Sequence, residues 1–279
     1  MKLKLTEINS PKLTPVIKCF ICWILFIVSL FVTGTLVTPL FPPGWERFIY
    51  GIFGTVAAFM VIWIILRVEH KTFFDYGLTW ERLTIARFAT GLFCGTAIFT
   101  FIILAMLIFT DLSMERSRFE WHPQSSFWYL SIIPLALMEE VAFRSYSLIK
   151  LDKAFGLRIA LPVSAIAFAI YHIITGWNVQ MAFLGPGIWA FVFGLSAIWS
   201  KGIALPTGLH VALNLGQQLV GMKAGTGEPV WVLKSGEHAS SASISQADFV
   251  GLLIQVFILA ATLVLTEVYL RKTKKTLID

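Results

Sequence analysis

The sequence predicts an all-α integral membrane protein, a bundle of about eight transmembrane helices whose N- and C-termini lie in the cytoplasm. Two features of the composition indicate a membrane protein. Of the 279 residues, 57% are hydrophobic and only 14% are charged, whereas about a quarter of the residues in soluble domains are charged. The mean hydropathy of +0.78 is far above that of water-soluble folds. The composition therefore excludes a secreted globular domain, a disordered chain and a disulfide-stabilised scaffold.

The apolar residues are gathered in runs. The length of each run is close to the roughly 20 residues that a helix needs to cross about 30 Å of hydrocarbon. The runs cover residues 19–38, 47–66, 86–110, 127–149, 157–175, 182–200, 203–220 and 249–269. Backbone amides in lipid must all be satisfied, so the spans are helices or the strands of a closed barrel. Barrel strands alternate in polarity over about ten residues, and these runs are longer and apolar on all sides. We therefore expect helices in a single polytopic domain, residues 1–279.

The distribution of basic residues predicts the orientation of this bundle. If successive spans alternate in direction, most of the 22 Lys and Arg residues fall on the side that holds both termini. The other side holds Arg47, Arg116, Arg118, Lys223 and Lys234. Lys and Arg concentrate in cytoplasmic loops, so we expect both termini in the cytoplasm. The net charge of +6 then reflects topology and contact with anionic headgroups, and it requires no nucleic-acid partner.

Polar side chains interrupt three of the spans, although a charge inside the bilayer costs at least about 2.5–3.5 kcal/mol. These side chains are Glu139, Glu140, Arg144, His172, His210 and Asn214. At a rise of about 1.5 Å per residue, Glu139, His172 and His210 fall at similar depths, midway across the membrane or slightly toward the cytoplasm. The shared depth predicts one site assembled from three helices.

Spacing within the fourth span separates the roles of its two acids. Glu140 and Arg144 are four residues apart with the acid first, which is the favoured order for an ion pair on a helix. Glu139 projects about 100° away around the helix and lies outside this pair. A carboxylate in such a site is suited to act as a general base.

The other two spans supply groups that complement this base. His210 and Asn214 are also four residues apart and present an imidazole and a carboxamide to one point, where they could stabilise an oxyanion. His172 could orient a water molecule between itself and Glu139. The set therefore suits hydrolysis of a peptide bond by activated water, without a serine or cysteine nucleophile.

Three motifs, E-E-x-x-x-R, F-x-x-x-H and H-x-x-x-N, resemble those of the CAAX protease and bacteriocin-processing family of intramembrane proteases, which includes the type II CAAX prenyl endopeptidase. They stand here as Glu139 to Arg144, Phe168 to His172 and His210 to Asn214, within a predicted core of residues 126–220. The resemblance implies that Glu139 and His172 activate water. It also implies that His210 and Asn214 form the oxyanion hole, that Phe168 packs beneath His172, and that eight helices form the fold.

The sequence thus predicts a glutamic-type intramembrane endopeptidase that requires no cofactor. The expected substrates are membrane-embedded or lipidated peptides and proteins, processed in the CAAX manner or in the manner of bacteriocins and pheromones. The expected location is an integral, multi-pass position in a lipid bilayer, the plasma or inner membrane for a bacterial chain. We expect a hydrated chamber that opens toward the cytoplasm.

Alternative interpretations of the same residues stay open. Glu139, His172 and His210 could bind Zn²⁺ with water as the fourth ligand, which would make the protein a metal-dependent endopeptidase. Buried Glu and His could instead carry protons in a proton-coupled transporter or ion relay. The protein could also be a non-catalytic membrane scaffold.

Other features are expected to be structural. Cys19 and Cys22 fall in a predicted helix, where we interpret them as packing residues. The Gly- and Ser-rich segment 221–248 is expected to be a mobile surface loop. Gly185-Pro186-Gly187 is expected to kink the sixth span.

Overall fold

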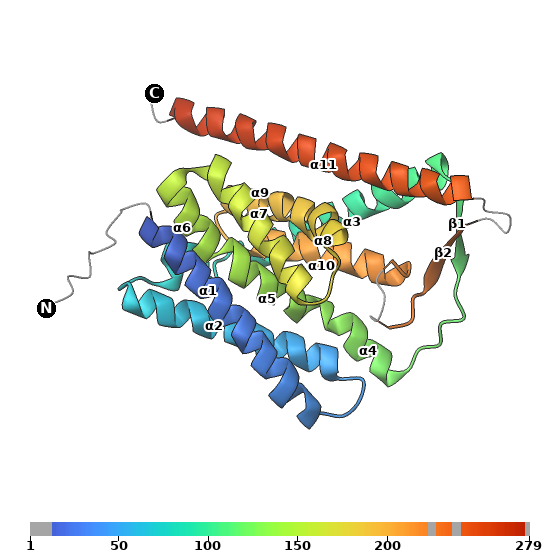
Figure 1. Cartoon of the computed structure of the whole chain (residues 1–279), viewed down its shortest axis with the longest axis horizontal. Helices are drawn as coiled ribbons and strands as arrows, with labels where there is room; N and C mark the ends of the chain where they lie inside the picture. The colour runs from blue at the N-terminus through green and yellow to red at the C-terminus, as the bar shows by residue number, and fades with distance from the viewer. Residues whose placement is uncertain (1–12, 223–226, 236–240, 277–279) are drawn as a thin grey trace, which may run out of the picture.

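The computed structural model describes residues 13–222, 227–235 and 241–276, and it confirms the predicted all-α membrane bundle (Figure 1). In these ranges, 7 helical segments are long and apolar enough to cross a membrane. They are Leu13–Leu40, Glu46–Val68, Thr84–Phe109, Pro123–Phe155, Leu157–Ile174, Val179–Ser200 and Gln246–Lys274. The remaining predicted span forms a helix of only 16 residues, about 24 Å long. The count of eight spans therefore stays a prediction, and Lys223 lies outside the described residues.

The elements follow one another along the chain with few interruptions. In order they are α1 Leu13–Val32, η1 Thr33–Val37, η2 Thr38–Leu40, α2 Glu46–Val68, η3 Phe73–Tyr76, α3 Thr84–Phe109, β1 Leu112–Arg116, α4 Pro123–Leu130, α5 Ile132–Arg144, α6 Tyr146–Phe155, α7 Leu157–Ile174, α8 Val179–Ala182, η4 Phe183–Gly187, α9 Ile188–Ser200, α10 Ala204–Leu219, β2 Trp231–Ser235 and α11 Ser241–Thr276. Figure 1 shows that the start of α1 and the end of α11 lie at one end of the bundle, and that β1 and β2 lie at the other. We name these the terminal end and the hairpin end.

The segment predicted as one span at 127–149 is divided into α4, α5 and α6. The helices separate at Ser131 and Ser145, both completely buried. Ser145 has φ −90° and ψ −106°, outside the helical region, which lets the chain change direction directly after Arg144. Its hydroxyl donates a hydrogen bond to the carbonyl of Val141. An apolar run indicates only that a segment is buried, so the sequence could not show these breaks.

The interpretation of 221–248 as a mobile loop was wrong where the structure describes it. Residues Trp231–Ser235 form β2, which pairs with β1 in antiparallel register, Leu112 opposite Ser235. The first turns of α11 also belong to this segment, because the helix begins at Ser241. The pairing partner lies more than a hundred residues away in the sequence, so local composition could not predict it.

Helices α3 and α10 pack closely because glycines line their contact. A Cβ atom added to Gly208 would lie 2.1 Å from the carbonyl oxygen of Phe88, and one added to Gly91 would lie 2.2 Å from that of Leu205. Gly95, one turn after Gly91, faces α10 in the same way. Small residues four apart allow helix backbones to approach in lipid. This contact fixes α10, the helix that carries His210 and Asn214.

The largest core cluster lies between α1, α2, α5, α6, α7 and α9, with Phe143 near its centre. The Phe143 ring contacts those of Trp23 and Phe26 on α1, with centroids 6.1 and 6.0 Å away. On its other side it contacts Phe168 and Tyr171 on α7, at 5.0 and 5.4 Å. The residue next to Arg144 thereby holds α5 between two neighbouring helices.

Glu69 joins three helices at the terminal end. Its carboxylate accepts hydrogen bonds from Lys150 at 2.7 Å and from the Tyr146 hydroxyl at 2.8 Å, and it pairs with Lys18 at 2.8 Å. Burial opposes ionisation, but the hydrogen bonds from Lys150, Lys18 and Tyr146 outweigh it and hold the pKa of Glu69 at about 2. The group therefore stays ionised and links α1, α2 and α6 over the ordinary pH range.

Replacing Gly208 by Ala is expected to lower the unfolding temperature in detergent, because the added methyl group would push against the Phe88 carbonyl. Overpacking of this kind costs about 1–3 kcal/mol. The matched control is Gly251→Ala on α11, where an added Cβ meets nothing within 4 Å. Thermal unfolding followed by tryptophan fluorescence measures both. Equal unfolding temperatures for the two variants would contradict the close α3–α10 contact.

Candidate active site

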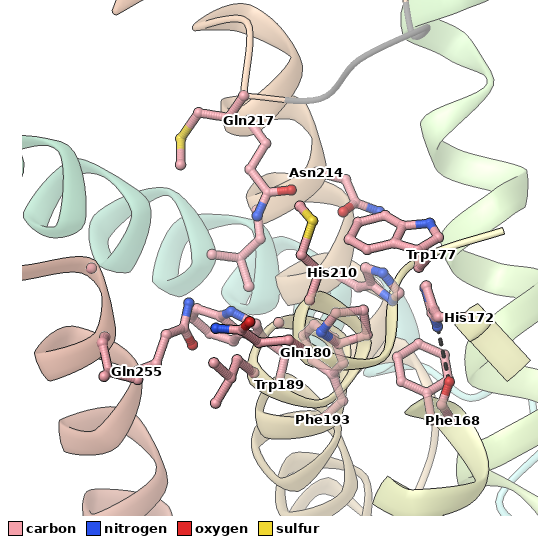
Figure 2. Close-up of a pocket in the computed structure, with 18 of the residues that line it drawn as sticks. Phe168, His172, Trp177, Gln180, Trp189, Phe193, His210, Asn214, Gln217 and Gln255 are labelled. Atoms are coloured by element: carbon pink, nitrogen blue, oxygen red, sulfur yellow. Dashed lines mark hydrogen bonds between the residues drawn. The ribbon is translucent and has the colours of Figure 1, made fainter. Parts of the chain in front are cut away.

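A cavity of about 660 Å³ brings the predicted site residues together. Its wall includes Glu139, Phe168, His172, His210 and Asn214, which come from α5, α7 and α10. Figure 2 shows the labelled side chains of His172, His210 and Asn214 around this pocket, with Trp189 and Phe193 of α9 beside them. The convergence of these three helices is the arrangement that the shared depth predicts.

His210 lies between the two acids of α5. Its Nδ1 is 2.8 Å from Oε1 of Glu140, and its Nε2 is 3.6 Å from Oε2 of Glu139. Adjacent residues on a helix project in different directions. The imidazole of His210 nevertheless contacts both Glu139 and Glu140, because its two nitrogens lie at different positions on the ring. Sequence reasoning missed this bridge, since the partners are 70 positions apart and no local pattern links them.

Glu140 and Arg144 form the ion pair that their spacing predicts, with Nε 3.5 Å from Oε2 and both side chains completely buried. Phe168, Phe193 and Phe143 surround the guanidinium carbon, with ring centroids 3.9, 5.4 and 5.8 Å away. Within the described part of the chain, the nitrogens of Arg144 have no hydrogen-bond partner. Aromatic faces attract a desolvated cation, so the rings and Glu140 together compensate for its burial.

Phe168 connects the ion pair to both imidazoles. Its backbone carbonyl accepts a hydrogen bond from Nδ1 of His172 at 2.9 Å, and its ring packs edge-on against the same imidazole at 4.5 Å. The ring of His210 lies 6.4 Å away on another side. His210 also stacks on Phe193, with centroids 4.5 Å apart. Phe168 thus occupies the packing position that the family resemblance implies.

These contacts constrain the protons on the two histidines. A carbonyl oxygen only accepts, so Nδ1 of His172 carries the proton and Nε2 is the acceptor nitrogen. The carboxylate of Glu140 likewise accepts from Nδ1 of His210. The Nε2 of His210 can therefore donate a hydrogen bond only when the ring carries both protons. The predicted oxyanion role of His210 requires this imidazolium form.

Glu139 has further polar neighbours that sequence reasoning missed. The hydroxyl of Tyr171 hydrogen-bonds to its carboxylate. Arg47 and Tyr50 on α2 lie close enough to interact with it electrostatically. The Glu139 side chain is 14% exposed. The sequence could have indicated Tyr171, because it directly precedes His172 in a span that carries a motif. It could not have indicated Arg47 and Tyr50, because their span carries no motif.

The proposed Zn²⁺ ligands do not form a metal-binding group. In residues 13–222, 227–235 and 241–276, no three His, Cys, Asp or Glu side chains are arranged to hold a metal ion. Glu139, His172 and His210 all line the cavity, but one nitrogen of His210 is directed at Glu140.

The cavity occupies the half of the bundle next to the hairpin end. It is lined by the later turns of α7 and α10 and by the early turns of α9 and α11. It also reaches Trp177, between α7 and α8, and Met222, which follows α10. The cytoplasmic termini and the cytoplasmic opening of the cavity both stay predictions.

The turn η4 shows the irregularity predicted at Gly185-Pro186-Gly187. It is a π-helical turn that contains Pro186, between α8 and α9. Pro186 lacks a backbone N–H, which removes one helical hydrogen bond. Gly185 and Pro186 line the cavity, so the irregular turn forms part of its wall.

Removing the cation at the site is expected to be far more damaging than removing the whole ion pair. Arg144→Met breaks the buried ion pair and leaves Glu140 with His210 alone, and breaking a buried pair costs about 3–5 kcal/mol. Adding Glu140→Gln should recover much of the loss, because a glutamine oxygen still accepts from His210. The control is Arg158→Met, which breaks an exposed pair with Glu267. Thermal unfolding compares the variants, and a double variant less stable than the single one would contradict this assignment.

A model of the family described as type II CAAX prenyl endopeptidase Rce1-like matches residues 121–216. No curated protein matches the chain. The matched segment runs from just before α4 into the last turns of α10 and includes all three motifs. Over this segment the chain is similar to the Rce1-like type II CAAX prenyl endopeptidases, which confirms the family resemblance predicted from the motifs.

Proposed function

We propose that this protein is an intramembrane endopeptidase that hydrolyses a peptide bond in membrane-associated or lipidated peptides or proteins. The observation that carries the proposal is the convergence of Glu139, His172, His210 and Asn214 on one cavity. The Rce1-like family match supports an endopeptidase of the CAAX type in general. The helices around the cavity support a reaction within the membrane.

In the proposed reaction, Glu139 accepts a proton from a water molecule held between it and His172. The hydroxide attacks the carbonyl carbon of the peptide and forms a tetrahedral intermediate with a negative oxygen. Glu139 then returns the proton to the nitrogen as the C–N bond breaks. The products are a carboxylic acid and an amine, which exchange a proton to become a carboxylate and an ammonium group, and no covalent enzyme intermediate forms.

His210 and Asn214 are proposed to stabilise the negative oxygen. As an imidazolium, His210 donates from Nδ1 to Glu140 and from Nε2 into the cavity. Asn214 follows one helical turn later on the same wall and offers a carboxamide N–H. Preorganised donors of this kind stabilise developing charge well in a site shielded from bulk water.

The buried ion pair is proposed to position the donors and to remain outside the chemistry. Glu140 and Arg144 do not line the cavity, and both are completely buried. Glu140 fixes His210 through Nδ1, and Phe168 contacts Arg144 and His172 on its two sides. Any shift of the pair would therefore displace both imidazoles.

Glu139→Gln is expected to abolish peptide cleavage while preserving the fold, because an amide retains the shape but cannot accept the proton from water. Loss of general-base catalysis typically costs about 10²–10⁴ in rate. The matched control is Glu115→Gln, an exposed acid on β1. Purified protein in liposomes with fluorogenic membrane peptides provides the assay. Wild-type rates in Glu139→Gln would refute the assignment, and ion flux without cleavage in the wild type would favour the relay.

Metal-independent hydrolysis predicts that cleavage survives strong chelation. The wild-type enzyme is incubated with 1,10-phenanthroline and dialysed before assay in the same liposomes. Unchanged rates are expected, because water activation is assigned to Glu139 and His172. Activity that is lost on chelation and restored by Zn²⁺ would contradict this mechanism and favour the Glu139, His172 and His210 metal site.

A further inference from the structure

Basic residues are distributed unequally between the two ends of the bundle. The terminal end carries them at the start of α1, in the α2–α3 connection, at the α6–α7 and α9–α10 turns and at the end of α11. Contacts confirm that these segments meet, since Lys153 donates to the Asp75 carbonyl and Gly77 adjoins Gly202. Among the described residues, the hairpin end carries only Arg47, Arg116, Arg118 and Lys234. The positive-inside rule therefore assigns the terminal end to the cytoplasm.

The cavity belongs to the opposite end. Its lining includes Trp177, Met222 and Asp248, which lie after α7, after α10 and in the early turns of α11. Its described lining includes nothing from the connections at the terminal end. Phe143, near the centre of the largest core cluster, follows Glu139 by one turn of α5 toward the terminal end. The cavity lies on the other side of Glu139, next to the hairpin end.

The charge of the lining restricts what the cavity can hold. Its carboxylates are Glu139 and Asp248, and its described lining contains no Lys or Arg. The groups there that can carry positive charge are the imidazoles of His172 and His210, which the proposed reaction already uses. A substrate with a free C-terminal carboxylate near the scissile bond would therefore face two carboxylates, with no Lys or Arg in the described lining to bind it.

Three glutamines supply the remaining polar surface. Gln180, Gln217 and Gln255 come from α8, α10 and α11 and surround the pocket in Figure 2. In the described structure, Oε1 of Gln255 is buried without a hydrogen-bond partner. Amide side chains both donate and accept, so they match the N–H and C=O groups of an extended peptide backbone that has left its helix.

We infer that the cavity opens to the extracytoplasmic side and accepts an internal peptide segment of neutral or positive charge. A cytoplasmic C-terminus of the CAAX kind would lie on the opposite side of the membrane from the cavity. Its carboxylate would also face the carboxylates of the cavity lining. The substrate class rests on the proposed endopeptidase function, whereas the sidedness rests on the helix arrangement and the basic residues alone.

Cysteine labelling tests the sidedness without any need for activity. Met222→Cys and Gln217→Cys report on the cavity, Ser113→Cys on β1 reports on the hairpin end, and Glu81→Cys reports on the terminal end. The unmodified chain, with Cys19 and Cys22 buried and Cys94 exposed, provides the background. A membrane-impermeant maleimide is added to intact cells and to permeabilised cells.

Labelling of Met222→Cys and Ser113→Cys in intact cells, with Glu81→Cys labelled only after permeabilisation, is the expected result. Gln217→Cys should follow Met222→Cys if the reagent enters the cavity. Labelling of Met222→Cys only after permeabilisation would overturn the inference. A cytoplasmic marker protein that stays unlabelled verifies that the cells are intact.

A pair of membrane peptides tests the charge preference in liposomes. The two share one sequence and end shortly after the scissile bond, one with a free carboxylate and the other with an amide. Several-fold faster cleavage of the amide is expected, and equal or faster cleavage of the free acid would overturn the charge argument. If neither peptide nor any longer internal segment is cleaved, the proposed function fails while the labelling result still decides the sidedness.

Discussion

The burial of Arg144 beside Glu140 is the interaction on which the rest of the site depends. A guanidinium inside a membrane protein must be neutralised locally, and here a carboxylate 3.5 Å away does so. The faces of three phenylalanine rings stabilise the cation further. Glu140 also binds His210, so the pair fixes the position of α10 relative to α5. Phe168 extends the same contact to α7 and His172. One buried charge thereby sets the relative positions of three helices.

The two adjacent acids have different surroundings, which explains why the site needs both. Glu140 is completely buried and paired, whereas Glu139 is partly exposed and faces the cavity. The first holds an imidazole, and the second can meet water. Tyr171 and the α2 residues Arg47 and Tyr50 add a polar surround to Glu139. The glycine contact between α3 and α10 holds the opposite wall in place.

The sequence sufficed to predict most of the fold and the polar residues that meet in one cavity. Apolar runs of membrane length reveal helices, and Glu139, His172 and His210 stand out because polar side chains in lipid are costly. Cys19 and Cys22 are buried, as expected for packing residues. The break at Ser145, the pairing of β1 with β2 and the His210 bridge could not be predicted, because each depends on partners distant in sequence or on backbone angles without a residue signature. The direction of the cavity also depends on all surrounding helices together.

A structure with a bound peptide phosphinate, whose tetrahedral oxygens imitate the attacked carbonyl, tests the central claim most directly. We expect one oxygen within hydrogen-bonding distance of His210 Nε2 and the Asn214 carboxamide, and the other beside Glu139 and His172. We also expect the peptide chain in the part of the cavity next to the hairpin end. A phosphinate bound elsewhere, or bound with His210 turned away from it, would contradict a shared hydrolytic site on α5, α7 and α10.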